Sequence, residues 1–282
     1  MEWLTETKIP LGQWISSLMD ALNEHADFVF YTISDVLEFI IENTIDFLVW
    51  LPALLIIAGF GILAFVLHKS WKLTAFTVLS LLLIVNLGYW EETMETLALV
   101  LYASLFCMVI GVPLGVASAH RPWLYQAMRP VLDLMQTIPT FVYLIPTLIL
   151  FGLGVVPGLI STVIFAIAAP IRLTHLGISS TPKALLEAGE SFGCTPRQLL
   201  FKVELPSAMP SIMAGLTQCI MLSLSMVVIA ALVGADGLGK PVVRALNTVN
   251  IAQGFEAGLA IVILAIVLDR ICRRENNQTS GQ

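Results

Sequence analysis

One polar, charged segment interrupts the apolar C-terminal half of the chain, and its composition favours contact with another protein. Its distinctive residues are Glu187, Ala188, Gly189, Gly193, Leu205 and Pro206. Pro182 suits the first turn of a helix, and Gly193 suits the end of one. We therefore expect residues 182–210 to form a helix–turn–helix whose acidic side suits an arginine-containing groove on a partner.

A second spacing matches a phosphate-binding loop without providing its chemistry. Residues 234–240 read Gly-Ala-Asp-Gly-Leu-Gly-Lys, which has the G-x-x-x-x-G-K spacing. The next residue is Pro241, although Mg²⁺ binding at this position requires Ser or Thr. We predict a turn joining two membrane spans here, and we expect no cofactor in this chain.

The remaining reactive residue types are scattered. The four cysteines show no CxxC or His-paired spacing, so neither a metal site nor a disulfide framework is predicted. The four histidines lie in the N-terminal tail or at loop edges, and we assign them no role. No catalytic residues stand out, and we expect a protein that is not an enzyme.

The most polar of the apolar segments is the candidate for a transport pathway. Its candidate pathway residues are Gln136, Thr137, Pro139, Tyr143 and Pro146. Proline breaks helical hydrogen bonding, which a membrane tolerates only where the freed groups line a cavity or are buried in protein. Packing between helices stays open as the alternative.

The composition predicts an all-α polytopic membrane protein. Hydrophobic residues make up 57% of the 282 residues and charged residues only 12%, too few to cover a soluble surface. The lipid interior requires every backbone group to be paired, so the spans must be helices. We predict seven of them, at about 48–67, 72–90, 94–118, 131–152, 156–174, 211–234 and 255–271.

The acidic stretch before these spans, residues 1–47, has apolar residues at helical spacing but is too charged to cross the bilayer. It can lie in the membrane interface or pack on the helix bundle. The basic residues set the orientation, because cytoplasmic loops are rich in Lys and Arg. All but Lys8, Lys240 and Arg244 of the chain's 14 Lys and Arg residues fall on one side, which predicts an external N-terminus and a cytoplasmic C-terminus.

The spacing of the charged segment resembles the coupling loop of permease subunits from ATP-binding-cassette importers. That pattern reads E-A-A, three residues, G, nine residues, I-x-L-P; here Gly189 replaces the last Ala and Val203 replaces Ile. Further segments at 135–146, 151–154, 170–174 and 190–199 are similar to glycine betaine/proline betaine permeases. The resemblance covers roughly residues 90–272.

The resemblance implies a type I ABC importer permease fold in the bacterial inner membrane. It divides the chain into an acidic amphipathic tail (1–47), two transmembrane helices (48–90), a permease core (91–274) and a polar C-terminal tail (275–282). It further implies uptake of glycine betaine, proline betaine, choline or a related osmoprotectant. The scarcity of ionisable residues within the spans argues against the alternative, an ion-coupled carrier or channel.

The partners implied are a separate ATPase that binds ATP and Mg²⁺, a periplasmic or extracellular substrate-binding protein, a second copy of this chain, and the lipid bilayer. No nucleic acid is expected as a partner. The residues implied to contact the ATPase are Glu187, Ala188, Gly189, Gly193, Leu205 and Pro206.

Overall fold

The computed structural model describes residues 10–273, and every regular element within them is helical. The first part of the acidic tail and the predicted polar tail at 275–282 lie outside the described residues. The N-terminal elements are α2 (Leu11–Trp50), α3 (Ala53–His68), α4 (Trp71–Leu87) and α5 (Trp90–His120). The middle elements are α6 (Pro122–Thr137), η1 (Thr140–Tyr143), α7 (Leu144–Phe151), α8 (Val155–Ala166) and α9 (Ala168–Ser179). The C-terminal elements are α10 (Lys183–Ser191), α11 (Pro196–Leu199), a π-helical turn η2 (Leu200–Glu204), α12 (Leu205–Ala230), η3 (Ala231–Val233), α13 (Gly239–Thr248) and α14 (Ile251–Cys272).

Among the described residues, four continuous helical segments are long and apolar enough to cross a membrane: 90–120, 155–179, 196–233 and 251–272. Two bent pairs, α2 with α3 and α6 with α7, would raise the number to six if each counts as one span, and α4 is a shorter apolar helix. The number of seven spans therefore stays a prediction. The expected span at 131–152 is not a straight helix: the chain bends by 107° between α6 and the following helical segment, and α6 begins earlier, at Pro122.

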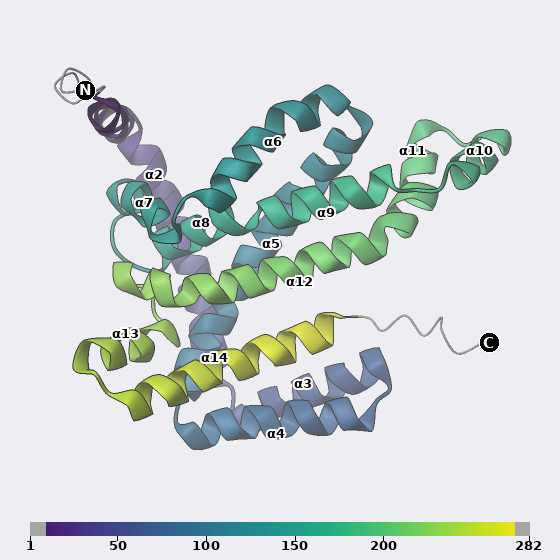
Figure 1. Ribbon diagram of the computed structural model, residues 1–282. Coiled ribbons are helices and arrows are strands. Elements are labelled where there is room, and N and C mark those ends of the chain that lie inside the picture. Colours follow the sequence, from purple (N-terminus) through teal and green to yellow (C-terminus); the bar gives the residue numbers. More distant parts are fainter. Residues whose placement is uncertain (1–9, 274–282) are drawn as a thin grey trace, which may run out of the picture.

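Helix α9 lies between α5 and α12 and forms the centre of the C-terminal bundle (Figure 1). Small residues allow this close packing. A Cβ on Gly115 of α5 would lie 2.6 Å from Thr174 Cβ of α9, and one on Gly177 of α9 would lie 2.8 Å from Ser211 Cβ of α12. Close backbone approach at glycine is a common basis of helix association in membranes, where lipid removes the hydrophobic driving force between helices.

A second packing region holds the α3–α4 hairpin against α14 (Figure 1). Ile84 of α4 and Leu264 of α14 are fully buried in the largest apolar cluster, which also contains Leu99 of α5 and Val227 of α12. The hairpin is therefore joined to the bundle through shared apolar contacts.

The acidic N-terminal region is one 40-residue helix, α2, that meets α3 at a bend of 99°. Its second half packs on protein. Ile41 is fully buried with Ala103 and Leu159, and the hydroxyls of Thr44 and Tyr102 lie 2.6 Å apart. Of the two placements left open by the sequence, packing on the bundle describes this half.

The segment with phosphate-loop spacing, residues 234–240, packs against α5 of the same chain. Gly234 and Gly237 adopt positive φ, and the Leu238 amide donates to Thr96 Oγ1 over 2.8 Å. A Cβ on Gly237 would lie 2.6 Å from that same oxygen, so the loop is packed against α5. The prediction of a simple turn between two spans is wrong, since the ten-residue helix α13 follows the loop.

Candidate functional site

The charged segment folds into two short helices that project from one end of the bundle (Figure 1). Helix α10 ends in a Schellman motif. The Cys194 amide donates to the Gly189 carbonyl over 3.1 Å, and the Gly193 amide donates to the Glu190 carbonyl over 2.9 Å. Gly193 has φ of +76°, the left-handed conformation that this motif requires. The expected role of Gly193 in ending the helix is therefore seen in the backbone.

A capping box starts the second helix. The Thr195 hydroxyl accepts from the Gln198 amide, and the Gln198 side chain accepts from the Thr195 amide over 2.8 Å. The helix continues through the π-helical turn at 200–204 into α12. Such wide turns occur often at functional sites, since they locally re-aim side chains. The turn and the cap connect the projecting segment to α12 without a flexible joint.

The predicted coupling residues divide between the outer surface and the base of this projection. Glu187, Ala188 and Gly193 are exposed, as is Pro206, whereas Leu205 is half-buried. Gly189 is buried, and a Cβ there would lie 2.6 Å from Leu199 Cδ1. Gly189 thus packs α10 on α11 and presents no side chain to a partner.

Sequence reasoning missed the aromatic side chain at the tip of the projection. Phe192 is 89% exposed and stands between the end of α10 and the turn at Gly193. An exposed aromatic ring beside acidic residues is a typical anchor for a protein–protein contact. The unusual exposure could not be read from the sequence, because the same pattern also describes a helix that buries its aromatic residue.

An ion pair at the base of the projection joins it to α5. His120 Nε2 lies 2.9 Å from Glu204 Oε2, and Glu204 is only 7% exposed. The other ring nitrogen of His120 lies 2.9 Å from the Val116 carbonyl, which can only accept. Both ring nitrogens of His120 therefore lie within hydrogen-bond distance of an oxygen, one on α5 and one on the projection. His120 thus makes a structural contact with the projection that the sequence alone did not indicate.

The candidate pathway segment is a sharp bend whose tightest contact is made by Tyr143. The Tyr143 hydroxyl donates to the Met135 carbonyl over 2.6 Å, linking η1 to the last turns of α6. Tyr143 is 9% exposed, and Pro146 is half-buried. Gln136, Thr137 and Pro139 are exposed on the other side of the break. The five predicted residues thus share one bend but face different surroundings.

Two contacts fasten α6 to α9. Arg172 Nη2 donates to Asp133 Oδ1 over 2.6 Å, and the rings of Tyr125 and His175 stack with centroids 3.6 Å apart. His175 Nδ1 lies 3.1 Å from Ser118 Oγ of α5. Because α9 runs directly to α10, these contacts place the bend and the projecting helices on one continuous support. The packing contacts of His175 were not indicated by the sequence.

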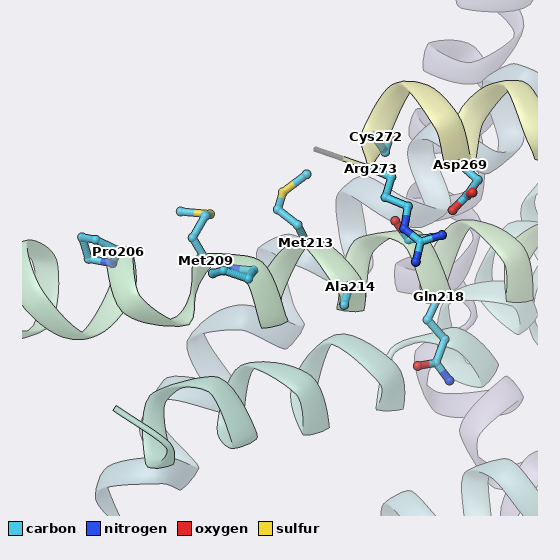
Figure 2. Close-up of a pocket in the computed structure, with 10 residues that line it drawn as sticks. Pro206, Met209, Met213, Ala214, Gln218, Asp269, Cys272 and Arg273 are labelled. Carbon is cyan, nitrogen blue, oxygen red and sulfur yellow. The ribbon is translucent and has the colours of Figure 1, made fainter. Parts of the chain in front are cut away.

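A cavity of about 920 Å³ lies between α12 and the end of α14. Figure 2 shows Met209 and Met213 on α12 and Arg273 and Asp269 near the end of α14. Gln218 adds a further polar group deeper along α12. Within residues 10–273, no three His, Cys, Asp or Glu side chains gather as metal ligands.

Comparison with known proteins reveals a family that matches the bundle and its projection. The family described as "Binding-protein-dependent transport system inner membrane component" matches residues 111–272. The glycine betaine/proline betaine transport system permease protein ProW of Escherichia coli strain K12 is 46% identical over 94% of this chain and 75% of its own length. The glycine betaine/carnitine transport permease protein GbuB of Listeria monocytogenes is 44% identical over 97% of this chain and 98% of its own length.

The fold also resembles that of a solved transporter. A chain of the inward-facing MetNI methionine ABC transporter aligns with a TM-score of 0.58 and 26% identity, covering 68% of this chain and 95% of that chain. The remainder of this chain lies outside that alignment.

Proposed function

Since this chain belongs to the family of binding-protein-dependent transport system inner membrane components, we propose that it imports glycine betaine, proline betaine or a related quaternary amine. The chain is a membrane component of an ATP-driven importer and not an enzyme; ATP and Mg²⁺ are the ligands of a separate ATPase. The observation that carries the substrate class is the identity of 44–46% to betaine permeases along almost the entire chain.

The projection formed by α10, α11 and η2 is the proposed contact with the ATPase. Glu187 and Ala188 lie on its exposed surface, and Phe192 and Gly193 form its tip. Gly189, Leu205 and Pro206 shape its base. An exposed carboxylate next to an aromatic ring suits a groove with arginine and apolar walls.

Movement at the projection would reach the bend through packed elements. Helix α10 follows α9, and α11 and η2 continue into α12. The Asp133–Arg172 ion pair and the Tyr125–His175 stack connect α9 to α6, whose end carries the bend. Rotation of the projection by ATP-driven closure of the ATPase would therefore shift α9, α12 and α6 together.

The pathway is proposed to lie between two copies of this chain. Gln136, Thr137 and Pro139 are exposed at the bend, and Tyr143 and Pro146 support them from behind. The cavity at Met209 and Met213 lies along the first half of α12, the helix that continues from the projection, and beside the end of α14 (Figure 2). We place the end that bears α10 and α11 in the cytoplasm, with the N-terminus outside, where a substrate-binding protein delivers its ligand.

The test is uptake of labelled glycine betaine in a host that lacks its own betaine importers and expresses this chain with its operon's ATPase and binding protein. A matched strain carries an ATPase variant that binds but cannot hydrolyse ATP. We expect uptake only with the active ATPase. Uptake that persists with the inactive ATPase and stops with a protonophore would instead identify an ion-coupled carrier.

A further inference from the structure

A basic cavity of about 740 Å³ lies where the α3–α4 turn meets the end of α14. Its charged lining consists of Lys72 from α4 and Arg270 and Arg273 from the end of α14. His68 also lines it, and its Nε2 lies 3.1 Å from the Ile271 carbonyl, which fixes the α3–α4 turn against α14. The cavity wall therefore comes from two parts of the chain about 200 residues apart that are held together by a direct contact.

The electrostatics of this cavity favour an anion. None of its described lining residues is acidic; Asp269, which lies near Arg273 in Figure 2, lines the neighbouring cavity between α12 and α14. Three ion pairs occur within residues 10–273, and none of them involves Lys72, Arg270 or Arg273. The first turn of α4 borders the cavity at Ser70 and Lys72 and contributes the positive end of a 17-residue helix.

The other walls are apolar and continue onto the outer surface of the helices. Leu73, Phe76 and Ile266 complete the lining. Phe76 is 42% exposed, and Leu79 on the next turn of α4 is 66% exposed. A free phosphate gains no favourable contact from these apolar side chains. A lipid can use both parts of the cavity, because its headgroup fits the basic part and its acyl chains lie along the apolar part.

The position of the cavity also fits the membrane interface. It surrounds the turn between two apolar helices, and Trp71 in this turn is 74% exposed. Exposed tryptophan is typical of the headgroup level of the bilayer. The turn and the end of α14 lie toward the same end of the molecule as α10 and α11 (Figure 1).

We propose that this cavity binds the phosphate headgroup of an anionic phospholipid in the leaflet on the side of α10 and α11. Basic pockets between transmembrane helices bind such headgroups by phosphate–cation contacts. Arg270 and Arg273 hold the phosphate from α14, Lys72 and the first turn of α4 hold it from the other side, and the acyl chains follow Phe76. A bound lipid thereby connects the N-terminal hairpin to the last helix.

The test measures lipid retained by the purified full-length protein, using native mass spectrometry after incubation with equal amounts of phosphatidylglycerol and phosphatidylcholine. We expect retention of phosphatidylglycerol over phosphatidylcholine. The double variant Arg270→Gln/Arg273→Gln should lower this preference about 30-fold, since about 1 kcal/mol for each basic residue is about 5-fold each. The matched control Arg121→Gln/Arg129→Gln removes two basic residues outside the cavity and should leave the preference unchanged.

A separate arm adds inorganic phosphate or glycerol 3-phosphate at the concentration of the lipid. We expect neither to displace phosphatidylglycerol, and displacement by either would overturn the lipid assignment in favour of a free-anion site. An equal loss in the control variant, or an unchanged preference in the Arg270→Gln/Arg273→Gln protein, would also overturn the proposal. If that double variant does not fold, Lys72→Gln on the other helix should still lower the preference about 5-fold.

Discussion

At the scale of single residues, the projecting helices depend on Gly193 and Glu204, and the two residues act through different interactions. Gly193 supplies a backbone conformation, with φ of +76°, and faces open space, because an added Cβ would have no neighbour within 4 Å. Glu204 supplies a buried carboxyl group that contacts the His120 ring. The first position therefore tests backbone conformation, and the second tests electrostatics.

We predict that Gly193→Ala weakens coupling more than Gly193→Asn. Alanine in the left-handed region costs about 1–2 kcal/mol, while asparagine adopts this region more readily. Since the chain itself leaves room for a side chain, the two variants differ mainly in backbone strain. The measurement is co-purification of the ATPase together with betaine uptake, at matched amounts of membrane protein.

The reverse order, with Gly193→Ala near wild type and the larger Gly193→Asn inactive, would mean that the partner's surface excludes side chains at this site. That result would move the role of Gly193 from the backbone to the interface. Normal binding and uptake in both variants would contradict the assignment of the projection as the coupling site.

For the ion pair, we predict that His120→Ala lowers the unfolding midpoint and that Glu204→Gln added to it restores part of the loss. The single change leaves a buried carboxylate without its partner, which costs about 1–3 kcal/mol. Removing the charge on Glu204 relieves that cost. A double-mutant cycle on thermal unfolding in detergent isolates the pairwise contribution. Additive effects of the two changes would show that the pair contributes nothing beyond its separate residues.

At the scale of elements, the Tyr143 hydroxyl joins the two sides of the bend between α6 and α7. We predict that Tyr143→Phe lowers maximal uptake with little change in preference among quaternary amines. The ring stays buried, but the Met135 carbonyl loses its donor, at a cost of about 1–3 kcal/mol. Competition uptake with glycine betaine and choline, at saturating binding protein, measures rate and preference together.

The matched control is Tyr31→Phe, which removes a hydroxyl from an exposed ring on α2 and should leave uptake unchanged. If Tyr143→Phe instead changes the preferred substrate at a normal rate, this residue takes part in selection. The permease, and not only the binding protein, would then discriminate among substrates.

The elements also show how far local sequence signals reach. The two short helices of the projection were predictable, because Pro182 and Gly193 specify helix ends through their own backbones. Pro139 indicated a break in the fourth predicted span, but the 107° bend also involves the Tyr143 contact across eight residues. His120 and Glu204 are 84 residues apart in the sequence, and the local sequence around each residue does not predict their contact.

Helix α13 was missed for a related reason. It is short and amphipathic, and it starts at Gly239 with Pro241 close behind, a composition that reads as a turn. The helix forms because its first turn packs on α12, where Gly239 lets the backbones approach; a Cβ there would lie 2.3 Å from the Val227 carbonyl oxygen. Tertiary packing therefore determines the helical structure of this segment, although its local sequence favours a loop.

At the scale of the whole molecule, α3, α4, α9, α12 and α14 lie roughly side by side between two ends (Figure 1). One end carries the α3–α4 turn, the α10–α11 projection and the end of α14, with Lys72, Lys183 and Arg270 among their residues. The other end carries α13 with Lys240 and Arg244. The basic residues that are scattered through the sequence thus gather at one end in space.

We predict from this distribution that the end with α10 and α11 is cytoplasmic, since positively charged loops are retained on that side. Alkaline phosphatase is active only outside the cytoplasm. It should therefore be inactive when it is fused after Gln282 and active when it is fused to the N-terminus. A cytoplasmic reporter such as green fluorescent protein should give the opposite result at both positions. A third fusion, within the loop between α13 and α14 at Val249, provides an internal check, because α13 belongs to the opposite end and should report like the N-terminus. Active phosphatase at Gln282 together with a silent fusion at Val249 would show that the orientation is the reverse of the one proposed. The α10–α11 projection would then lie on the side of the membrane that has no ATP. In that case the projection could not couple the permease to an ATPase.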